Sequence, residues 1–570
     1  MDERIDITIN GTRRIRAERG ANLLKTLRSA GVYFSAVCGG RGVCGKCAVR
    51  AVSGFPPVSS ADEAYFTPED IRAGWRLACA AFPDSALDIA VLETGEERFS
   101  AVTDFEFDSV VCALEERRFS PEKSPVSFAR QIKPEGGLTL AELRQTAKLA
   151  EVSSGTEVQA YYDQGRIIHI GTERLSGIAV DVGTTTIAFA AVDLRTGSIL
   201  GRFSAVNRQR EYGADVITRI QRANEDCLGA LSLCVREQIA EGVAALRSSA
   251  DIGIPRKIAV AGNTAMLHLL LGLSCKTLGI SPFTPVTVDI VTMRYCELFS
   301  EDFDCEVVLL PGISAYIGAD ITAGVFFADM RRSTVPAAFM DIGTNGEMAL
   351  MYGGKLLCAA TAAGPAFEGG NIFWGIGSVP GAIARVTFRN GGFAAETIGN
   401  LPPIGICGSG IVDTVYQGLI NGFIQRSGKF AEGLREIMLA RHSDGRDIVF
   451  TQKDVRELQL GKSAVRSGFD ALLNRAGIGY EDVQVLHLAG GFGFNLNLAS
   501  AAGIGLIPEP LIPKVRLIGN SALGGAVKYL LNPYYADEFA GIAENAEEWS
   551  LPADSFFNER FIANLPFNEF

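Results

Sequence analysis

Four of the twelve cysteines lie close together near the start of the chain and have the spacing of metal ligands. Five residues separate Cys38 from Cys44, two separate Cys44 from Cys47, and Cys79 follows after thirty-one more. Four thiolates are the ligand set of a [2Fe–2S] cluster. Residues 38–47 also include four glycines, which allow backbone N–H groups to approach the sulfides of such a cluster. We therefore expect these four cysteines to bind a [2Fe–2S] cluster.

A zinc ribbon is the alternative for a set of four cysteines. Such a site usually contains two CxxC pairs, whereas this segment contains one, formed by Cys44 and Cys47. The five-residue gap resembles the adrenodoxin and putidaredoxin type of ferredoxin, which favours the iron–sulfur interpretation. The other eight cysteines are scattered along the chain, and we expect them to be small core residues.

Short strands around one helix must position the cysteine ligands. We expect this helix to begin after Asn22 and a second to begin after Thr67, where Pro68 follows the N-cap. Apolar and polar residues alternate around these helices, and an Asn-Gly pair predicts a hairpin turn. The expected strands are 5–9, 13–17, 48–52 and 87–92. This order predicts a β-grasp sheet.

Two glycine-rich segments farther along the chain have the composition of a phosphate-binding site. Residues 177–186 (GIAVDVGTTT) and 338–347 (AFMDIGTNGE) each combine an apolar strand, an Asp, a Gly and a Thr. Backbone N–H groups after the Gly can cradle phosphates, and Asp181 and Asp341 can hold Mg²⁺ through its water shell. The repeat predicts two homologous halves, in which buried strands are followed by glycine turns and helices. The candidate phosphate ligands are Gly183, Thr184, Thr185, Thr186, Gly343, Thr344, Asn345 and Gly346.

Two other glycine segments complete a candidate site for ATP. Residues 488–494 (LAGGFGF) follow an apolar strand and are expected to receive the adenosine. Residues 406–410 (ICGSG) open a helix, and they either belong to the same cleft or form a helix-packing contact. Neither phosphate turn is a GxxxxGK[ST] loop or a GxGxxG fingerprint. The prediction of ATP binding therefore depends on the presence of two similar turns together with the Gly-Gly segment. The candidate residues of the two added segments are Gly408, Ser409, Gly490, Gly491 and Phe492.

Several polar residues near these segments have alternative roles. Glu347 and Glu368 either orient water or adenosine in the site or are ion-paired structural acids. Asn263 and Thr264 lie at a strand-to-helix corner, where they either cap the helix or contact the cleft. The four histidines share no spacing, and we expect none of them to bind a metal.

The paired turns resemble the phosphate loops of the acetate and sugar kinase, Hsc70 and actin (ASKHA) superfamily. The whole chain resembles the reductive activators of corrinoid-dependent methyltransferases and O-demethylases, in the variant with an N-terminal [2Fe–2S] domain. The further stretches that carry this resemblance are YGADV at 212–216, GNTAM at 262–266, AAGPAFEG at 362–369, QKDVR at 452–456 and GNSAL at 519–523.

This resemblance implies a reaction and a set of partners. The cluster would pass one electron to the cobalt(II) of a corrinoid (cobalamin-binding) protein, giving cobalt(I), and ATP hydrolysis would make the transfer productive. Asp181 and Asp341 would organise Mg²⁺ as the catalytic acids of the two turns. The implied partners are the corrinoid protein of a methyltransferase or O-demethylase system and an external low-potential electron donor. A homo-oligomer is left open.

The same resemblance implies an α/β multidomain fold. It consists of a β-grasp ferredoxin domain, a small α+β middle domain and a duplicated actin-like or Hsc70-like ATPase domain. The expected bounds are 1–95 for the ferredoxin domain, 96–175 for a linker and the middle domain, and 176–570 for the ATPase domain, with halves at about 176–335 and 336–570.

The region 96–175 carries fewer signals than the rest. The charged, proline-flanked stretch 115–125 indicates a linker, and residues 138–147 indicate a helix. Residues 158–162 and 166–170 indicate a hairpin.

Two other functions remain open from the sequence. One is an ATP-driven electron injector for another low-potential acceptor, like the activators of acyl-CoA dehydratases and aryl-CoA reductases. Those typically hold a [4Fe–4S] cluster between subunits, so a four-cysteine [2Fe–2S] domain disfavours this interpretation. The other is a redox-sensing scaffold that binds ATP without hydrolysing it, against which the acids at both phosphate turns argue.

Charge and hydropathy exclude some classes of partner. The net charge of −12 argues against nucleic acid, since phosphate binding needs a positive surface. The charged start of the chain is unlike a signal peptide, and no apolar run approaches the roughly 18 residues of a membrane helix. We therefore expect a cytoplasmic protein that binds no membrane.

Overall fold

The computed structural model describes most of the 570 residues. It leaves out residues 1–3, 31–39, 41, 43, 44, 46, 92–102, 106–111, 113, 124, 133–137, 154, 164, 173, 214, 300–302, 304, 495, 533, 569 and 570. The predicted cluster ligands Cys38 and Cys44 therefore lie outside the described residues, whereas Cys47 and Cys79 lie within them.

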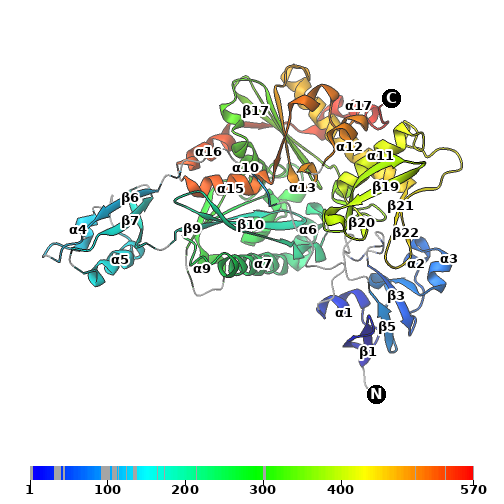
Figure 1. The fold of residues 1–570 in the computed structure, drawn as a ribbon, viewed down its shortest axis with the longest axis horizontal. Helices are drawn as coiled ribbons and strands as arrows, with labels where there is room; N and C mark the ends of the chain where they lie inside the picture. The colour runs from blue at the N-terminus through cyan, green and yellow to red at the C-terminus, as the bar shows by residue number, and fades with distance from the viewer. Residues whose placement is uncertain are drawn as a thin grey trace.

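The first sheet has the β-grasp topology that the sequence predicts. Its strands run in the order β2-β1-β5-β3-β4, with β1 parallel to β5 at the centre (Figure 1). Three leucines of helix α1 (Leu23–Ser29) are buried against it. A capping box between Thr67 and Asp70 starts helix α3 (Pro68–Arg72) where the sequence places it. The other elements are β1 (Arg4–Ile9), β2 (Arg13–Glu18), β3 (Ala48–Ser53), α2 (Ser60–Tyr65), β4 (Trp75–Leu77) and β5 (Leu87–Ala90).

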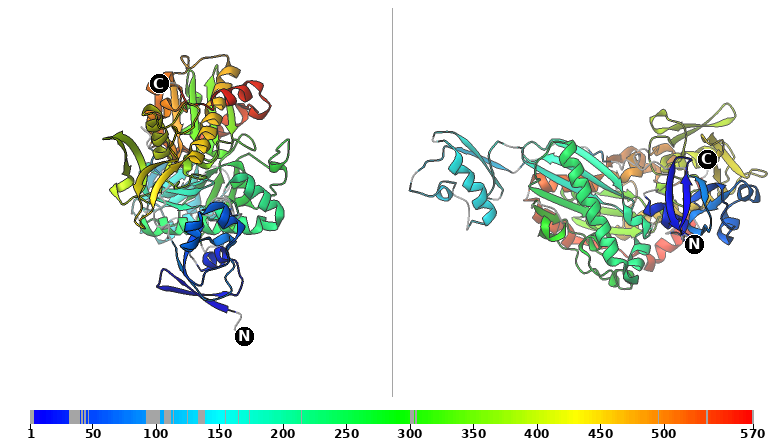
Figure 2. Two further views of the ribbon diagram at one scale, coloured as in Figure 1. Left: turned by 90° about the vertical axis from the view of Figure 1, so that its right-hand side faces the viewer. Right: turned by 90° about the horizontal axis from the view of Figure 1, so that it is seen from below.

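The second sheet is a small one of three strands, in the order β6-β7-β8. The predicted hairpin and helix are confirmed, but the linker predicted at 115–125 is wrong in its first half, where residues pair with β7 as an edge strand. The guanidinium of Arg117 lies 4.2 Å from the centre of the Tyr162 ring, and this contact stabilises the charged strand. Figures 1 and 2 place this unit and the ferredoxin sheet at opposite ends of the molecule. Its elements are β6 (Glu115–Phe119), α4 (Phe128–Ile132), α5 (Leu140–Ala147), β7 (Val158–Asp163) and β8 (Arg166–Ile170).

Two six-stranded sheets confirm the internal duplication. The first runs β11-β10-β9-β12-β14-β13 and the second β24-β23-β15-β16-β17-β25. Apart from the edge strands β13 and β25, the order β11-β10-β9-β12-β14 of the first sheet corresponds to β17-β16-β15-β23-β24 of the second. In each sheet the first three of these strands are antiparallel, and the last two are parallel to the third. We call the two units the first and second lobe. Their strands are β9 (Ser176–Val182), β10 (Thr186–Asp193), β11 (Ile199–Val206), β12 (Lys257–Gly262), β13 (Val291–Arg294), β14 (Glu306–Leu309), β15 (Ala337–Ile342), β16 (Gly346–Tyr352), β17 (Lys355–Thr361), β23 (Val485–Ala489), β24 (Val515–Gly519) and β25 (Ala546–Glu548).

The element after each glycine turn differs from the prediction. Each turn joins two antiparallel strands, β9 to β10 and β15 to β16, whereas the sequence predicts a helix after each turn. The apolar residues after the turns lie in strands that are buried on both faces, a pattern that cannot be told from a buried helix by periodicity. Helices instead follow the later strands, which are β11, β12, β13 and β14 in the first lobe and β23 and β24 in the second.

Helices α10 (Ala319–Phe327) and α15 (Ser521–Leu531) lie against each other between the two sheets (Figure 1). Gly525 permits this contact, since a Cβ built on it would lie 2.2 Å from the carbonyl oxygen of Ala323. The remaining α-helices of the lobes, outside the insertion described next, are α6 (Val216–Arg222), α7 (Leu228–Ser249), α8 (Thr264–Leu271), α9 (Tyr295–Leu298), α12 (Gln452–Ala476), α13 (Gly490–Phe494), α14 (Leu498–Gly503), α16 (Tyr535–Asn545) and α17 (Ser555–Ala563).

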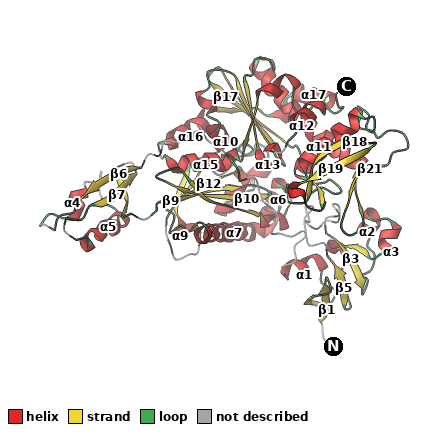
Figure 3. Ribbon diagram, in the orientation of Figure 1, coloured by secondary structure: helices red, strands yellow, loops and turns green. Residues whose placement is uncertain are grey.

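An insertion between β17 and β23 extends the second lobe towards the ferredoxin sheet (Figures 1 and 3). It contains one three-stranded sheet, one hairpin and a helix that starts with the ICGSG segment. Its elements are β18 (Ala382–Arg389), β19 (Gly392–Thr397), β20 (Gly405–Ile406), α11 (Gly408–Ile420), β21 (Glu436–Arg441) and β22 (Asp447–Thr451). Among the helices that the structure describes, none is both long and apolar enough to cross a bilayer.

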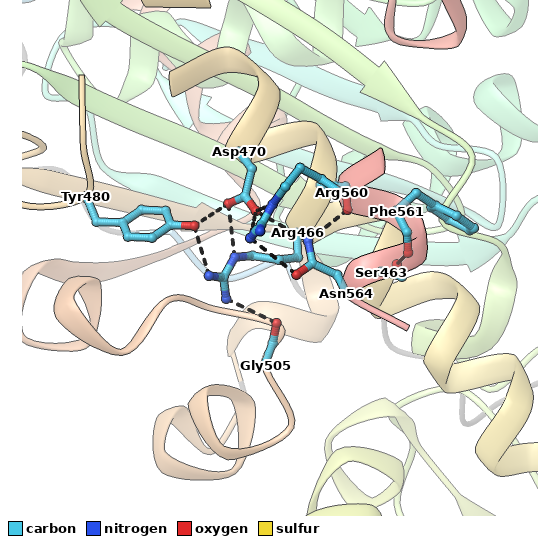
Figure 4. A network of polar contacts seen from close by, with 9 residues as sticks. Ser463, Arg466, Asp470, Tyr480, Gly505, Arg560, Phe561 and Asn564 are labelled. Carbon is cyan, nitrogen blue, oxygen red and sulfur yellow. Dashed lines mark hydrogen bonds and ion pairs between the residues drawn. The ribbon is translucent and has the colours of Figure 1, made fainter. Parts of the chain in front are cut away.

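A buried carboxylate holds the C-terminal helix in place. Asp470 of α12 accepts hydrogen bonds from Arg466 at 3.0 Å, Tyr480 at 2.5 Å and Arg560 of α17 at 2.8 Å (Figure 4). Burial alone would raise the pKa of Asp470, but these partners outweigh it and lower the pKa. The last helix is therefore tied to the second lobe through one ionised group.

Candidate functional site

The two glycine turns line one cavity of about 400 Å³ between the lobes. Most of the predicted nucleotide residues contribute to its walls. Gly346 and Ser409 do not, because Gly346 packs against Val465 below the second turn and Ser409 is buried beside the thiol of Cys407. The predicted residues that line the cavity are Asp181, Gly183, Thr184, Thr185, Thr186, Asp341, Gly343, Thr344, Asn345, Gly408, Gly490, Gly491 and Phe492.

The first turn is held from behind by polar side chains. A Cβ on Gly183 would lie 2.7 Å from the carbonyl oxygen of Thr186, so the turn is tight enough to favour glycine. The amide of Asn207 donates to the Gly183 carbonyl at 2.8 Å, and the guanidinium of Arg219 donates to the Thr184 carbonyl at 2.5 Å. Burial lowers the pKa of Arg219 to about 9, which leaves it a cation at neutral pH. A fixed positive charge therefore lies directly behind this turn.

Asn263 has both of the roles that the sequence leaves open. Its side-chain oxygen accepts from the backbone N–H of Met266 at 3.0 Å and so caps α8. Its amide nitrogen donates to the hydroxyl of Thr184 at 3.1 Å in the first turn. The start of α8 is thereby fixed to the cleft.

Glu368 connects the two turns. One of its carboxylate oxygens accepts from the hydroxyl of Thr185 at 2.9 Å and from that of Thr344 at 2.6 Å. The two threonines lie in the corresponding turns of the two lobes, one position apart in the repeat, since Thr344 aligns with Thr184. This acid therefore bridges the two turns that are expected to bind phosphate. The sequence alone leaves the role of Glu368 undecided.

Acidic side chains gather at the carboxyl ends of the central strands. Burial raises the pKa of Asp181 to about 6, against the lowering effect of a 3.0 Å hydrogen bond from Asn520. Burial, followed by repulsion from Asp320 and Asp181, raises the pKa of Asp341 to about 7. Burial, followed by repulsion from Asp320 and Asp341, also raises the pKa of Glu347. This electrostatic strain is what a bound cation relieves.

Asp320 is an acid of this cluster that sequence reasoning does not identify. It lies in the first turn of α10, and burial, followed by repulsion from Asp181, raises its pKa to about 7. The available signal is an acidic residue near a glycine at the start of an otherwise apolar helix. That pattern has no defined spacing to either turn, so it does not indicate a site.

The glycines on the adenosine side are required by close packing. Gly490 has φ +87°, and a Cβ there would lie 2.4 Å from a carboxylate oxygen of Asp341. A Cβ on Gly408 would lie 1.9 Å from the carbonyl oxygen of Phe367. The rings of Phe367 and Phe492 pack with centroids 4.8 Å apart and form an apolar wall. These residues line the same cavity as the two phosphate turns.

The two predicted cluster cysteines that the structure describes lie beside the ferredoxin sheet, Cys47 directly before β3 and Cys79 in the turn after β4. Both are buried, and the N–H of Ala78 donates to the carbonyl of Cys47 at 2.9 Å, which brings Cys79 beside that loop. Asn22 donates to the carbonyl of Cys79 at 2.8 Å. A Cβ on Gly40 would lie 3.7 Å from the Cβ of Cys79, so the glycine loop reaches the same place. Buried thiols beside a glycine loop fit an iron–sulfur cluster.

Three family models match the chain. A 2Fe-2S iron-sulfur cluster binding domain matches residues 7–84, and the RACo middle region matches residues 176–333. The C-terminal domain of RACo, which is the ASKHA domain, matches residues 336–569.

Curated relatives and a solved structure resemble the chain over much of its length. The corrinoid activation enzyme RamQ of Eubacterium limosum is 32% identical over 69% of this chain and 70% of its own. The [Co(II) methylated amine-specific corrinoid protein] reductase of Methanosarcina barkeri is 26% identical over 69% and 77%, respectively. A solved reductive activator for a corrinoid, iron–sulfur protein superposes with a TM-score of 0.73 at 29% identity, over 99% of this chain and 98% of that one. The chain therefore belongs to the RACo-type family of corrinoid activation enzymes, with a 2Fe-2S domain ahead of its ASKHA domain.

Proposed function

We propose that this chain is an ATP-dependent reductive activator of a corrinoid protein. One electron passes from its [2Fe–2S] cluster to cobalt(II), giving cobalt(I), while ATP and water are converted to ADP and phosphate. The observation that carries the proposal is the cavity between the two turns, because Gly45 and Ala48 of the ferredoxin domain line it together with the phosphate turns. We infer that a nucleotide bound in this cavity would lie beside the electron-carrying domain.

The difference in reduction potential between cluster and cobalt opposes the proposed electron transfer. When bound, the cluster supplies single electrons at a potential of about −400 mV for a plant-type centre. The cobalt(II)/cobalt(I) couple is expected to lie lower, and each deficit of about 59 mV lowers the equilibrium yield roughly tenfold. We propose that ATP hydrolysis compensates for this deficit by changing the arrangement of the lobes.

The residues of the cleft divide the work of holding ATP. The two turns offer backbone N–H groups and hydroxyls to the phosphates, and Gly490 and Phe492 form the slot for adenosine. Arg210 lines the cavity and Arg219 lies behind the first turn, so both favour a polyphosphate. The acids of the cleft would repel a polyphosphate that carries no cation. We propose that Asp181, Asp320 and Asp341 hold hydrated Mg²⁺ that enters with ATP.

An electron donor, an electron acceptor and a set of domain boundaries complete the proposed function. We propose that an external low-potential donor reduces the cluster and that the corrinoid protein receives the electron. We also propose domain boundaries near residues 95 and 175, with the ATPase halves meeting near residue 335. A cytoplasmic location follows from the need for reduced thiols and ATP.

The decisive experiment mixes the reduced holoprotein with a cobalt(II) corrinoid protein under anaerobic conditions and follows the cobalt(I) absorbance. We expect cobalt(I) with Mg²⁺ and ATP, and little with a non-hydrolysable ATP analogue. Cys79→Ser should abolish the transfer, while Cys112→Ser, at a cysteine outside the ferredoxin sheet, should preserve it. Full reduction with the analogue would reject the coupling to hydrolysis, and failure of ATP to bind would reject the function.

A further inference from the structure

The ferredoxin domain contacts the second lobe through stacked side chains. The guanidinium of Arg446 lies between two indole rings, 4.4 Å from the centre of Trp75 and 4.9 Å from the centre of Trp374. The Tyr65 ring stacks on Phe373 with centroids 6.0 Å apart. We call these five residues the ferredoxin interface. Stacked cation–π and aromatic contacts are individually weak, as a reversible contact requires.

Arg446 is held in position by a contact within the second lobe, independently of the ferredoxin domain. It lies in the turn between β21 and β22, where Asp444 accepts from its Nε at 2.8 Å and from its Nη2 at 2.7 Å. Burial alone would raise the pKa of Asp444, but Arg446 outweighs it and lowers the pKa to about 2. The ion pair therefore persists at physiological pH, and the guanidinium plane is held ready for both indoles.

One short segment, residues 368–374, belongs to both the phosphate site and the ferredoxin interface. At its start, Glu368 accepts from the threonine hydroxyls of the two turns. At its end, Phe373 and Trp374 stack on the ferredoxin domain and on Arg446. We call residues 368–374 the coupling segment.

The coupling segment is compact, and its backbone closes on itself at residues 375 and 376. A Cβ on Gly375 would lie 2.1 Å from the carbonyl oxygen of Gly369, and a Cβ on Gly369 would lie 2.4 Å from that of Ile376. The backbone N–H of Gly375 donates to the carbonyl of Ile372 at 3.1 Å. Because the segment folds back on itself with backbone in contact with backbone, a shift at Glu368 reaches Trp374 instead of being absorbed between them.

We propose that the coupling segment links nucleotide binding to release of the ferredoxin domain. Phosphate groups that take the hydroxyls of Thr185 and Thr344 displace Glu368, and the resulting shift of the segment breaks the stacking at the ferredoxin interface. The released domain is then free to approach the corrinoid partner. This inference rests on the proposed ATP site, and it adds a residue-level route between that site and the cluster domain.

Thermodynamic reciprocity allows a sharp test of this route. If nucleotide releases the ferredoxin domain, then weakening the interface must tighten nucleotide binding, by up to the factor that couples the two equilibria. Arg446→Ala removes the central cation, and Trp75→Leu removes one indole from the ferredoxin side. Arg441→Ala is the matched control, since Arg441 lies on the same hairpin in an exposed ion pair with Asp447.

The first measurement is the Kd of a fluorescent, non-hydrolysable ATP analogue with Mg²⁺ for each holoprotein. We expect Arg446→Ala and Trp75→Leu to bind about fivefold more tightly than the parent protein and Arg441→Ala, in the range of ordinary coupling factors. Equal Kd values for all four proteins would overturn the coupling while leaving the ATP site intact. No binding by any of them would instead refute the proposed function.

The second measurement uses intrinsic fluorescence, because the chain has three tryptophans and two of them form the interface. In a Trp549→Phe holoprotein, emission comes from Trp75 and Trp374 alone. We expect the analogue to move this emission to longer wavelength as the indoles become hydrated, and Arg446→Ala to show the shift without nucleotide. Emission that does not respond to saturating analogue would reject the release.

Discussion

The side-chain amide of Asn520 on the second lobe donates a 3.0 Å hydrogen bond to Asp181 on the first lobe. The duplication places Asp320 near Asp341 in the corresponding position, at the start of the equivalent helix. Each lobe thus presents the start of one helix, α10 or α15, to the central acid of the other. The interaction energies of the two pairs differ in sign. The amide of Asn520 stabilises the carboxylate of Asp181, whereas the carboxylate of Asp320 repels that of Asp341. The cleft is therefore electrostatically unequal, and its Asp320–Asp341 side has the greater need for a cation.

Stability without a divalent cation should fall as the pH rises. Asp181, Asp320 and Asp341 have folded-state pKa values of about 6, 7 and 7, against about 3.9 for an unfolded Asp. Between about pH 4 and pH 7 the folded state therefore binds more protons than the unfolded state, and its stability decreases with increasing pH. We expect Mg²⁺ to flatten this dependence. Melting temperatures at pH 5 and pH 8, with chelator or with Mg²⁺, measure it, and a chelated protein that melts higher at pH 8 would contradict it.

Asp320→Asn should separate stability from turnover. The amide removes the repulsion at Asp341, so the protein without cation should melt at a higher temperature at pH 8 and show a weaker pH dependence. The same change removes a proposed Mg²⁺ partner, and ATP hydrolysis should decrease at least tenfold. Asp289→Asn, at an exposed acid of the same lobe, serves as the control and should alter neither quantity. Undiminished hydrolysis by Asp320→Asn would remove this acid from the cation site.

Gly490→Ala should abolish nucleotide binding without affecting the ferredoxin domain. The added Cβ would lie 2.4 Å from the carboxylate of Asp341 and must push apart the adenosine side and the acidic cluster. Gly477 has a similar φ of +70°, but a Cβ there would meet no atom within 4 Å, so Gly477→Ala reports the cost of φ alone, about 1 kcal/mol. Calorimetric titration with ATP and Mg²⁺ compares the two variants. Equal affinities would show that the packing around Gly490 is not essential.

Asp470→Asn should destabilise the second lobe. Loss of the carboxylate leaves Arg466 and Arg560 without their shared partner, and breaking a buried ion pair costs about 3 kcal/mol. Asp447→Asn disrupts the exposed pair with Arg441 and should cost less than about 1 kcal/mol. Differential scanning calorimetry compares the transitions of the ATPase domain, and similar shifts for both variants would argue against the anchoring role in Figure 4.

Local patterns predict the parts of this molecule that are set by local interactions. The capping box at Thr67, the ferredoxin strands and the repeated Asp-x-Gly-Thr turns all follow from short-range spacing. Their pairing in one cleft follows from the duplication. The strand after each turn was not predictable, since a strand buried on both faces has the same apolar pattern as a buried helix.

Roles that depend on contacts between distant segments could not be assigned from the sequence. Asp320 and Trp374 belong to no motif with fixed spacing, and Glu368 is a candidate whose role the sequence leaves open. Each acquires its role from a residue far away in the chain. The strand at β6 was mispredicted for a related reason. Its charged residues indicate solvent exposure, which an edge strand and a linker share, and only pairing with β7 distinguishes the two.

We expect any motion between the lobes to pivot where α10 and α15 meet at Gly525. No side chain separates the two backbones there, so sliding at this point has little room and rotation about it is the motion that we expect. A swing moves atoms in proportion to their distance from the axis. Small displacements near the contact are therefore amplified towards the outer rim of each sheet. A larger side chain at position 525 would separate α10 from α15 without contacting the nucleotide.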